Sequence, residues 1–264
     1  MTKAIWINRI PSALITWRWF QSRLLPTAMQ GGLFGDICGG KMTKISESAG
    51  IGMVATLSGL KQRGYSPKVV YDIGAADGSW TRQALEFWPE STYVCFEPLA
   101  ERKKDLDALQ ASRPEQIFVE ACGVGDADEE LPIGVTDFLW DSSFAYSGSS
   151  SRTVPVRRLD SLIEAGRPLP SFIKIDVQGF EKRVLDGGQA AMRNADLILM
   201  ECTFFPFCED MRTLDVTIAY MSAHNFIPYE FVDYLRRPFD GAMGQCDILF
   251  VRKGHQLVAD NKWS

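Results

Sequence analysis

Short apolar runs alternate with helical segments along most of the chain from Pro67 onward. The runs that we expect to be strands are Val69–Ile73, Thr92–Phe96, Gln116–Ala121, Phe172–Ile175, Leu197–Met200 and Ile248–Val251. Most are continuously apolar, which is typical of strands covered on both faces of a mainly parallel sheet. The intervening segments that suit helices are Trp80–Phe87, Ala100–Ala111, Gly179–Asp186 and Leu214–His224. This alternation predicts a doubly wound, Rossmann-like α/β domain.

One stretch departs from this alternation. Leu131–Val135 and Thr153–Arg157 are expected to pair as an antiparallel hairpin around the polar segment Asp141–Arg152. That segment contains SSFAYSGSSS, and its serines and glycine indicate a mobile loop. Loops above a rigid α/β scaffold often form binding lids, so we expect a lid here. The candidate substrate contacts in this lid are Ser142, Ser143 and Tyr146.

The first 66 residues lie outside the alternating pattern. A helix is expected from about Lys44 to Arg63, with Gly64 as its C-terminal stop. Pro67 then opens the first strand of the alternating region. The expected divisions of the chain are an N-terminal helical extension over 1–66, a main domain over 67–254 and a C-terminal tail over 255–264.

The segment before Asp36 is basic and rich in tryptophan. It contains four basic residues and no acidic ones, interleaved with Trp6, Trp17 and Trp19. One interpretation is a helical cap that packs these rings on the main domain. The other is an amphipathic helix in peripheral contact with an anionic membrane surface. We expect a cytoplasmic protein, and no run of about 18 apolar residues occurs that would predict a membrane-spanning helix.

Composition narrows the function classes. A net charge of −5 argues against a nucleic-acid-binding protein, which normally carries a basic excess. The six cysteines form no C-x-x-C pair, and two histidines are too few for a zinc-finger pattern. Cysteines inside apolar runs are typical of a reducing compartment. Composition does not indicate an oligomeric state.

The sequence VVYDIGAADGSWT, residues 69–81, reads as a strand, a glycine-rich turn and the start of a helix. Gly74 allows a sharp turn, and Gly78 would let the backbone approach a ligand that a Cβ atom would exclude. Amides at the helix start favour anionic or strongly polar groups. Glu97 ends the next strand 97 − 78 = 19 residues later, where an acid can accept hydrogen bonds from ribose hydroxyls. The motif therefore predicts a site for a nucleoside-containing cofactor.

The residue order in the turn separates two cofactor classes. Dinucleotide dehydrogenases carry G-x-G-x-x-G, whereas this turn reads D-x-G-x-A-x-G from Asp72 to Gly78. No G-x-G pair is present to seat a pyrophosphate, and Asp77 would repel one. An acid at this position is compatible with a cationic sulfonium or an ammonium group. The residues therefore favour S-adenosylmethionine over a dinucleotide.

Three sequence blocks in order resemble the FkbM family of S-adenosylmethionine-dependent methyltransferases, and they cover roughly Pro67 to Lys253. The first is VVYDIGAADGSWT followed by FEP. The second, FIKIDVQGFEKRVLDGG at 172–188 followed by LILMEC, is the most distinctive. The third is GQCDILFVRK at 244–253. The chain departs from the common pattern at Gln178, where many members have Glu, and at Ala76, where many methyltransferases have Gly.

The resemblance implies a class I methyltransferase fold and a set of cofactor roles. It implies that the turn at 72–78 holds the methionine moiety, that Glu97 binds the ribose, and that 121–126 lies by the adenine. Asp126 or a backbone amide near Cys122 would read the exocyclic amine, and the sequence does not decide between them. The candidate cofactor residues are Asp72, Gly74, Ala75, Asp77, Gly78, Glu97, Cys122 and Asp126.

Methyl transfer to an oxygen depends on positioning and on removal of the hydroxyl proton. Asp176 follows the strand beside the cofactor strand, so it would position or deprotonate the acceptor, or cap the next helix. Glu181 in that helix and Asp247 in an apolar strand are further catalytic candidates. Glu201 ends the next strand and is a substrate candidate. Converging carboxylates could also hold Mg²⁺ or Ca²⁺, but we expect no metal.

The predicted function is O-methylation of a hydroxyl, which is the activity that the resemblance implies. The expected acceptor is a sugar or glycan, a glycolipid or a natural product. The choice among these stays open, because fold alone does not identify a substrate. Two alternatives belong to other classes: a non-catalytic binding partner with this fold, and a nucleotide-dependent oxidoreductase. The retained glycine turn and Glu97 argue against the first, and the missing G-x-G pair argues against the second.

Overall fold

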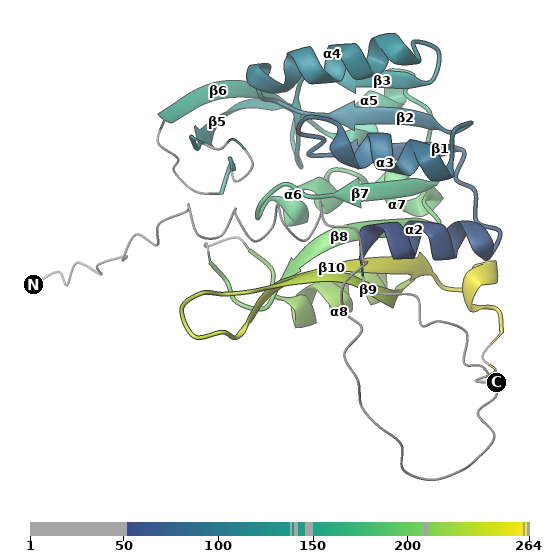
Figure 1. The fold of residues 1–264 in the computed structure, drawn as a ribbon. Helices are drawn as coiled ribbons and strands as arrows, with labels where there is room; N and C mark the ends of the chain where they lie inside the picture. Colours follow the sequence, from purple (N-terminus) through teal and green to yellow (C-terminus); the bar gives the residue numbers. More distant parts are fainter. Residues whose placement is uncertain are drawn as a thin grey trace, which may run out of the picture.

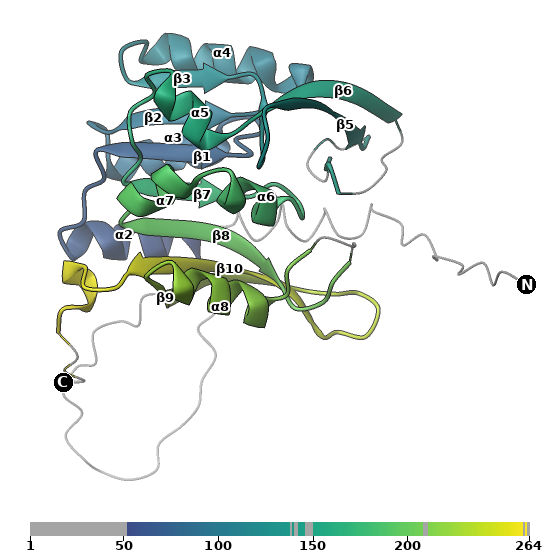
Figure 2. The same ribbon diagram turned by 180° about the vertical axis from the view of Figure 1, so that it is seen from behind.

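The computed structural model describes residues 52–137, 139, 142–145, 150–207, 211–260 and 262. Predictions for residues 1–51, including the first part of the helix expected from Lys44, lie outside the described residues. The same holds for Tyr146 in the expected lid. The described residues contain a central sheet with helices on both faces and a second, smaller sheet (Figures 1 and 2).

Seven strands form the central sheet in the order β3-β2-β1-β7-β8-β10-β9 (Figure 1). They are β1 (Val69–Ile73), β2 (Thr92–Phe96), β3 (Ile117–Glu120), β7 (Phe172–Ile175), β8 (Leu197–Thr203), β9 (Phe226–Arg236) and β10 (Met243–Arg252). The strands from β3 to β8 pair parallel, and β10 pairs antiparallel with β8 and β9. The chain runs outward from β1 to β3 and returns on the other side of β1 at β7. The switch point between β1 and β7 is where ligands bind in such sheets, at the carboxyl ends of the strands.

Helices cover both faces of the sheet. One face carries α2 (Met53–Gln62), α3 (Ser79–Phe87) and α4 (Lys103–Ser112). The other face carries α5 (Leu159–Glu164), α6 (Glu181–Asp186), α7 (Gln189–Asn194) and α8 (Leu214–Ala223). Short 3₁₀ helices occur at Ala100–Arg102 and Gln256–Val258.

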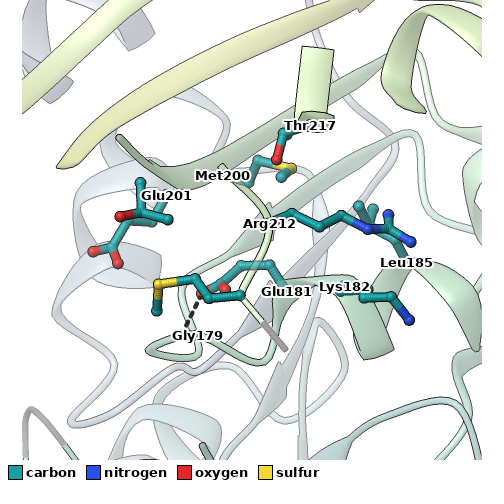
Figure 3. Close-up of a pocket in the computed structure, with 10 residues that line it drawn as sticks. Gly179, Glu181, Lys182, Leu185, Met200, Glu201, Arg212 and Thr217 are labelled. Atoms are coloured by element: carbon teal, nitrogen blue, oxygen red, sulfur yellow. Dashed lines mark hydrogen bonds between the residues drawn. The ribbon is translucent and has the colours of Figure 1, made fainter. Parts of the chain in front are cut away.

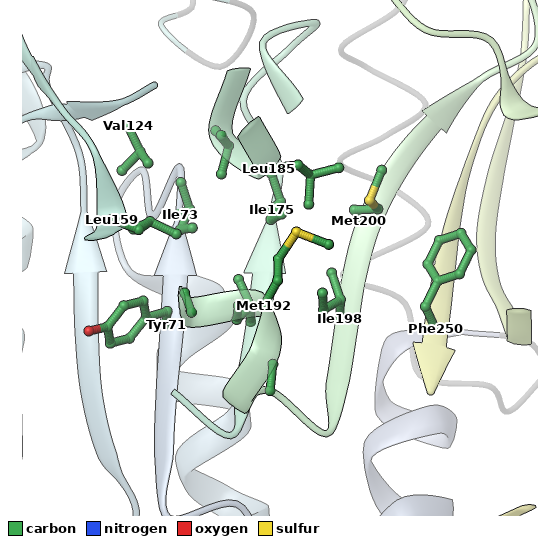
Figure 4. Packing of buried hydrophobic residues seen from close by; sticks show 14 of the residues in the cluster. Tyr71, Ile73, Val124, Leu159, Ile175, Leu185, Met192, Ile198, Met200 and Phe250 are labelled. Carbon is green, nitrogen blue, oxygen red and sulfur yellow. The ribbon is translucent and has the colours of Figure 1, made fainter. Parts of the chain in front are cut away.

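Alternate residues of each parallel strand pack into the two helical layers. On β1, Tyr71 and Ile73 belong to the core cluster that contains residues of α5, α6 and α7 (Figure 4), whereas Val70 belongs to the cluster that contains residues of α2, α3 and α4. All three side chains are at most 1% exposed. Burial on both faces explains why these strands have continuously apolar sequences.

The second sheet has three strands and follows β3 in the chain. β4 (Gly123–Val124) pairs parallel with β6 (Ser150–Arg157), and β6 pairs antiparallel with β5 (Glu129–Val135). The predicted hairpin of Leu131–Val135 and Thr153–Arg157 is therefore confirmed. In both ribbon views, β5 and β6 project past the carboxyl ends of the central strands. The hairpin therefore stands beside the edge where a ligand would bind.

The predicted doubly wound α/β fold is confirmed, and the differences have local causes. The helix predicted from Gly179 begins at Glu181, because Gln178 and Gly179 adopt positive φ angles of 55° and 95°. The sequence did not predict α5, α7, β4 or β9. Helix α2 packs on α3 and β9, and its Thr56 donates a hydrogen bond to Glu230. The described end of the expected N-terminal extension therefore packs on the main domain, and the domain limits stay a prediction.

Candidate functional site

The turn after β1 is packed tightly between two neighbouring strands. Gly74 has a φ of 77°, and a Cβ atom there would lie 1.9 Å from the backbone oxygen of Asp176. On the other side, the amides of Gly74 and Ala75 both donate to Phe96 O at 3.0 Å. Only glycine fits the Gly74 position, for conformation and for space. The turn is therefore held by backbone contacts. One of them is with Asp176, the residue expected to position or deprotonate the acceptor.

A buried ion pair between Asp72 and Lys174 holds the turn in place. Asp72 is fully buried and accepts a hydrogen bond from Thr81 Oγ1 at 2.7 Å. Its other oxygen lies 3.0 Å from Lys174 Nζ, which also donates to Gly74 O at 2.7 Å. Asp72 was expected among the cofactor residues, and its carboxylate faces these protein groups. Its contribution to a ligand is therefore made through the position of the turn.

Glu97, the expected ribose acid, is held in a fixed orientation at the end of β2. Its Oε2 accepts the amide of Ala76 at 2.9 Å, and its Oε1 accepts the amide of Leu99 at 2.9 Å. The side chain is 8% exposed, and burial raises the pKa of Glu97 above its ordinary value. Each oxygen has a second lone pair, so the carboxylate can still accept hydroxyl hydrogen bonds.

The end of the turn is occupied by Asp77 and Gly78. Asp77 Oδ1 accepts the amide of Ser79 at 2.9 Å, which satisfies a donor in the first turn of α3. Gly78 has a φ of 78°, and a Cβ atom there would lie 2.6 Å from Leu109 of α4. Gly78 was expected to admit a ligand. The structure gives it a second role, the close packing of α3 against α4.

The stretch expected beside the adenine presents Asp126 at the surface and buries Cys122. Arg183 on α6 donates from Nε to Asp126 and from a terminal nitrogen to Glu129. The Cys122 amide donates to Glu120 O at 2.9 Å, and burial raises the pKa of the Cys122 thiol to about 12. Both groups considered for the adenine amine therefore have protein partners, and the choice between them stays a prediction.

The residues around the turn fit S-adenosylmethionine. The turn at 72–78 contains two acids and no basic residue, which suits a cation and disfavours a pyrophosphate. Glu97 adds a carboxylate from the neighbouring strand, with both oxygens already oriented. This donor set matches an adenosyl group that carries a sulfonium and an ammonium.

Asp176 lies at the carboxyl end of β7, on the other side of the switch point. Its Oδ1 accepts Gln178 Nε2 at 2.9 Å, and its Oδ2 lies 3.9 Å from Lys174 Nζ. The side chain is 19% exposed, so it is accessible to an acceptor. Lys174 thus lies between the carboxylate under the cofactor turn and the carboxylate beside it. The family-like block at 172–188 was recognised in the sequence, but this role of Lys174 was not.

Glu181 begins α6 and folds back over the turn before it. Its Oε1 accepts the amides of Gly179 at 3.1 Å and Val177 at 3.4 Å. Burial, reinforced by the charge of Asp176, raises the pKa of Glu181 to about 7. The carboxyl therefore titrates in the physiological range, unlike an ordinary glutamate.

A pocket opens between α6, the end of β8 and the segment that leads to α8 (Figure 3). Its volume is about 370 Å³, including space open to solvent. Predicted residues Glu181 and Glu201 both line it, so the fold brings them together as expected. Other lining residues, which the sequence did not single out, are Met200, Thr203, Met211 and Arg212. The pocket mixes hydroxyl-binding groups with apolar walls, which is typical of small-molecule sites.

Asp247 lies one strand further from the switch point. It is directly opposite Glu201 in the β8–β10 register. Gln245, two residues earlier on β10, donates from Nε2 to Glu201 Oε1 at 2.5 Å. Asp247 therefore lies beside Glu201, one of the two acidic residues of the pocket, and two strands further from β1 than Asp176.

The described part of the expected lid is anchored to the acceptor side. Ser143 is 1% exposed, and its Oγ donates to the backbone oxygen of Gln178 at 2.6 Å. Phe144 stacks on Phe180 with ring centroids 4.8 Å apart. Ser142 is half-buried and accepts a hydrogen bond within the hairpin. The serine predicted to contact substrate thus joins the β5–β6 hairpin to the turn that carries Asp176.

Neither a metal-binding cluster nor a membrane-spanning helix occurs in the described part of the chain. Among the described residues, no group of three or more His, Cys, Asp or Glu side chains is arranged to hold a metal ion. Within the same ranges, no helix combines the length and apolar character needed to cross a membrane.

Comparison with known proteins identifies the family. The methyltransferase FkbM domain matches residues 72–228, more than half of the chain. The 2-O-methyltransferase NoeI of Sinorhizobium fredii is 30% identical over 156 residues, which cover 50% of this chain and 62% of that protein. The hexuronic acid methyltransferase AglP of Haloferax volcanii is 22% identical over 134 residues, which cover 50% of this chain and 55% of that protein. The chain thus spans less than two thirds of either relative.

Among solved structures, the methyltransferase FkbM from Methylobacillus flagellatus aligns with a TM-score of 0.47 at 18% identity, over 69% of this chain and 43% of that chain. The predicted family and its cofactor, S-adenosylmethionine, are confirmed by the domain match. The chain belongs to the FkbM family of methyltransferases.

Proposed function

We propose that this chain is an S-adenosylmethionine-dependent O-methyltransferase that acts on a hydroxyl of a sugar, glycan, glycolipid or natural product. The observation that carries the proposal is the contact between the cofactor turn and Asp176. A Cβ atom at Gly74 would lie 1.9 Å from Asp176 O, so no residue separates the two. One relative is named a 2-O-methyltransferase and the other a hexuronic acid methyltransferase, which supports an oxygen acceptor on a sugar.

The bound cofactor supplies an electrophilic methyl group. On this proposal, the turn at 72–78 holds the methionine part, with Asp77 near its cationic groups. Glu97 accepts the ribose hydroxyls, and 121–126 borders the adenine. Asp72 and its partner beneath the turn keep the backbone in place, so the cofactor site depends on a buried ion pair that need not touch the ligand.

Asp176 orients the acceptor hydroxyl and accepts its proton, which makes the oxygen a better nucleophile. Gln178 holds Oδ1 by a hydrogen bond of 2.9 Å, so the carboxylate has a defined orientation. Lys174 Nζ, 3.9 Å from Oδ2, adds a positive charge on the buried side. The accessible side of the carboxylate is then the side from which an acceptor approaches.

Glu181 and Glu201 hold the remaining hydroxyls of the acceptor. Because the pKa of Glu181 is raised to about 7, this group can both donate and accept hydrogen bonds near neutral pH. Glu201 and Thr203 line the same pocket from β8. Asp247, opposite Glu201, is the second candidate for positioning the acceptor.

The proposal is tested by calorimetric titration with S-adenosylmethionine, S-adenosylhomocysteine and NAD, followed by transfer of a labelled methyl group to a panel of hydroxylated acceptors. Asp176→Asn should leave cofactor affinity unchanged and reduce transfer by roughly 10²–10⁴, the usual contribution of a general base. Asp215→Asn, at an exposed acid in α8, is the matched control.

The titration also separates the alternatives. Binding of NAD alone would replace the proposal with the oxidoreductase. A folded protein that binds none of the three compounds would point to a non-catalytic binding partner. Full transfer activity in Asp176→Asn would move the proton acceptor to another residue.

A further inference from the structure

Three phenylalanines and an arginine form a cluster next to the pocket residue Thr203, with Phe207 and Phe239 exposed and Phe205 and Arg237 half-buried. Arg237 lies over the ring of Phe205 at 3.9 Å and near the ring of Phe239 at 5.5 Å. Phe207 lies 6.3 Å from Phe205, between ring centroids. Phe207 is 53% exposed and Phe239 is 81% exposed. We call these four residues the aromatic platform.

The aromatic platform is held in place by the hairpin between β9 and β10. Arg237 donates from Nε and a terminal nitrogen to the two oxygens of Asp240, at 2.7 and 2.6 Å. The Arg237 amide donates to Ala242 O at 2.9 Å. On the other side, Phe204 N donates to Gly244 O at 2.9 Å, which joins the phenylalanine segment to β10. Asp240 therefore holds the guanidinium between the rings, and backbone hydrogen bonds hold both segments that carry the rings.

The aromatic platform is continuous with the pocket. The chain leaves the pocket at Thr203, whose Oγ1 donates to Phe205 O at 2.7 Å. It returns to the pocket wall at Met211 and Arg212, and Thr203 forms a bridge with Thr213. In both ribbon views, the β9–β10 hairpin projects past the carboxyl end of β8, beside this segment. A ligand seated in the pocket would therefore have the platform as its next contact.

The chemistry of the surface favours one class of occupant. Exposed aromatic faces next to a polar pocket mark a binding surface, because such side chains supply large contact areas at low entropic cost. The apolar C–H face of a sugar ring stacks well on a phenylalanine ring. An anionic membrane would require a basic excess, but Arg236 and Arg237 are balanced by Asp233 and Asp240. The platform thus suits a neutral ring better than a charged surface.

We infer that the acceptor contains at least two sugar rings, with the methylated ring in the pocket and the adjoining ring on the aromatic platform. This inference rests on the proposed function. It extends that function, because residues outside the pocket would select acceptors of two or more rings.

The test uses the full chain, saturated with S-adenosylhomocysteine, on an array of mono-, di- and tetrasaccharides built from the same hexoses and hexuronic acids. Bound sugars should contain two or more rings. Phe207→Ser and Phe239→Ser should each weaken that binding by about tenfold, as expected for the loss of one well-packed aromatic contact. Arg237→Lys keeps the charge but loses the planar stack, and it should weaken binding in the same direction.

Phe231→Ser is the matched control, because Phe231 is 55% exposed on β9 but does not belong to the aromatic platform. It should leave sugar binding unchanged. Equal binding of single sugars, unchanged binding in all three platform variants, or absence of any sugar binding would overturn the inference. Binding of the chain only to vesicles of anionic lipid would overturn it too. Failure to bind S-adenosylhomocysteine would instead refute the proposed function, so the two failures are distinguishable.

Discussion

The two sides of the switch point between β1 and β7 are formed by different kinds of contact. On the side proposed to bind the cofactor, the backbone of the turn after β1 packs on backbone, with Gly74 against Asp176 O and Asp72 fully buried. On the side proposed to bind the acceptor, side chains from α6 and β8 surround a pocket that is open to solvent. The same edge of the sheet therefore contains one rigid region and one adaptable region.

This difference teaches where variation is tolerated. A cofactor shared across a family favours a site defined by backbone geometry, where almost any added atom causes a clash. An acceptor that differs between relatives favours a site defined by side chains. There, the substitution of one side chain changes the affinity for the acceptor gradually. Substitutions on the cofactor side should therefore act almost all-or-none, and substitutions on the acceptor side should act gradually.

The largest effect is expected from Gly74→Ala. The new Cβ atom would lie 1.9 Å from Asp176 O, at a φ of 77°. We expect the variant to lose about 3 kcal/mol of unfolding free energy, since backbone cannot yield as a side chain can. Calorimetry should detect no binding of S-adenosylhomocysteine, and urea unfolding should report the stability.

Gly64→Ala is the control for this effect. Gly64 has nearly the same φ, 80°, but nothing lies within 4 Å of its added Cβ atom. It should cost only about 1 kcal/mol, the strain of a left-handed alanine, and leave cofactor binding intact. Equal losses in the two variants would show that conformation, and not the contact with Asp176, makes Gly74 necessary.

Lys174→Met should cost at least as much unfolding free energy as Gly74→Ala but should only weaken cofactor binding, so its effect on the site comes second. It removes the ammonium 3.0 Å from Asp72 and leaves that carboxylate fully buried, with Thr81 donating to its other oxygen. Breaking a buried pair on one side typically costs about 3 kcal/mol or more. We expect this loss in urea unfolding, together with weaker cofactor binding.

The double variant Lys174→Met with Asp72→Asn distinguishes charge from shape. Neutralising Asp72 removes the unpaired buried charge, so part of the lost unfolding free energy should return. If the double variant is less stable than Lys174→Met alone, the ion pair does not explain the cost.

The sequence predicted the rigid region far better than the adaptable one. Strands β1, β2 and β7 were predicted with their observed limits, because burial on both faces produces continuous apolar runs. Strand β9 was missed because it is an edge strand with mixed polar and apolar residues and a proline at Pro228. Helices α5 and α7, of six residues each, were also missed, whereas α6, of the same length, was predicted.

The candidate site follows the same division. Gly74 and Glu97 belong to a local motif whose spacing is visible in the sequence. Thr203 and Arg212 line the same pocket, and Thr203 forms a bridge with Thr213, ten residues later in the chain. No sequence pattern between β8 and α8 predicts this pairing. Lys174 was part of a recognised block, but its partner Gly74 lies 100 residues away. Pairings at that range depend on the fold.

On the acceptor side, Glu181→Gln should change the pH dependence of stability. The ordinary pKa of 4.5 is raised to about 7 in the folded protein, so the folded state binds more protons between these values. The wild type should therefore lose stability as pH rises through this window, and the variant should not. We expect the fall in Tm between pH 5 and 8 to be about 5 °C larger in the wild type.

The wild type and Glu181→Gln differ in one titrating carboxyl, and they share every other titrating group. The introduced glutamine would retain a side-chain oxygen that can accept the amide of Gly179, which Glu181 accepts at 3.1 Å, so the turn should persist. Glu115→Gln, at an exposed glutamate before β3, is the control for a general change in net charge. A Tm profile of Glu181→Gln that parallels the wild type would contradict the assignment.

The smallest effect is expected from Ser143→Ala. This change deletes the hydroxyl that donates to Gln178 O at 2.6 Å and accepts the amide of Ala145 at 2.9 Å. The first of these bonds is the link between the hairpin and the turn that carries Asp176. A single hydrogen bond contributes about 1 kcal/mol, so KM for the acceptor should rise about fivefold. Steady-state kinetics should show this rise, and titration should show unchanged affinity for S-adenosylmethionine.

Ser142→Ala tests whether the link to the turn matters, and not merely the loss of a hydroxyl. Ser142 accepts the amide of Thr136 at 3.1 Å, so its hydrogen bond stays within the hairpin. It should leave KM nearly unchanged, because no contact with Gln178 is lost. A rise in KM confined to Ser143→Ala would mean that the hairpin positions the acceptor side through one backbone oxygen. If Ser143→Ala instead weakens cofactor binding, the hairpin affects the cofactor turn as well as the acceptor pocket. The different contacts that hold the two sides would not predict this result.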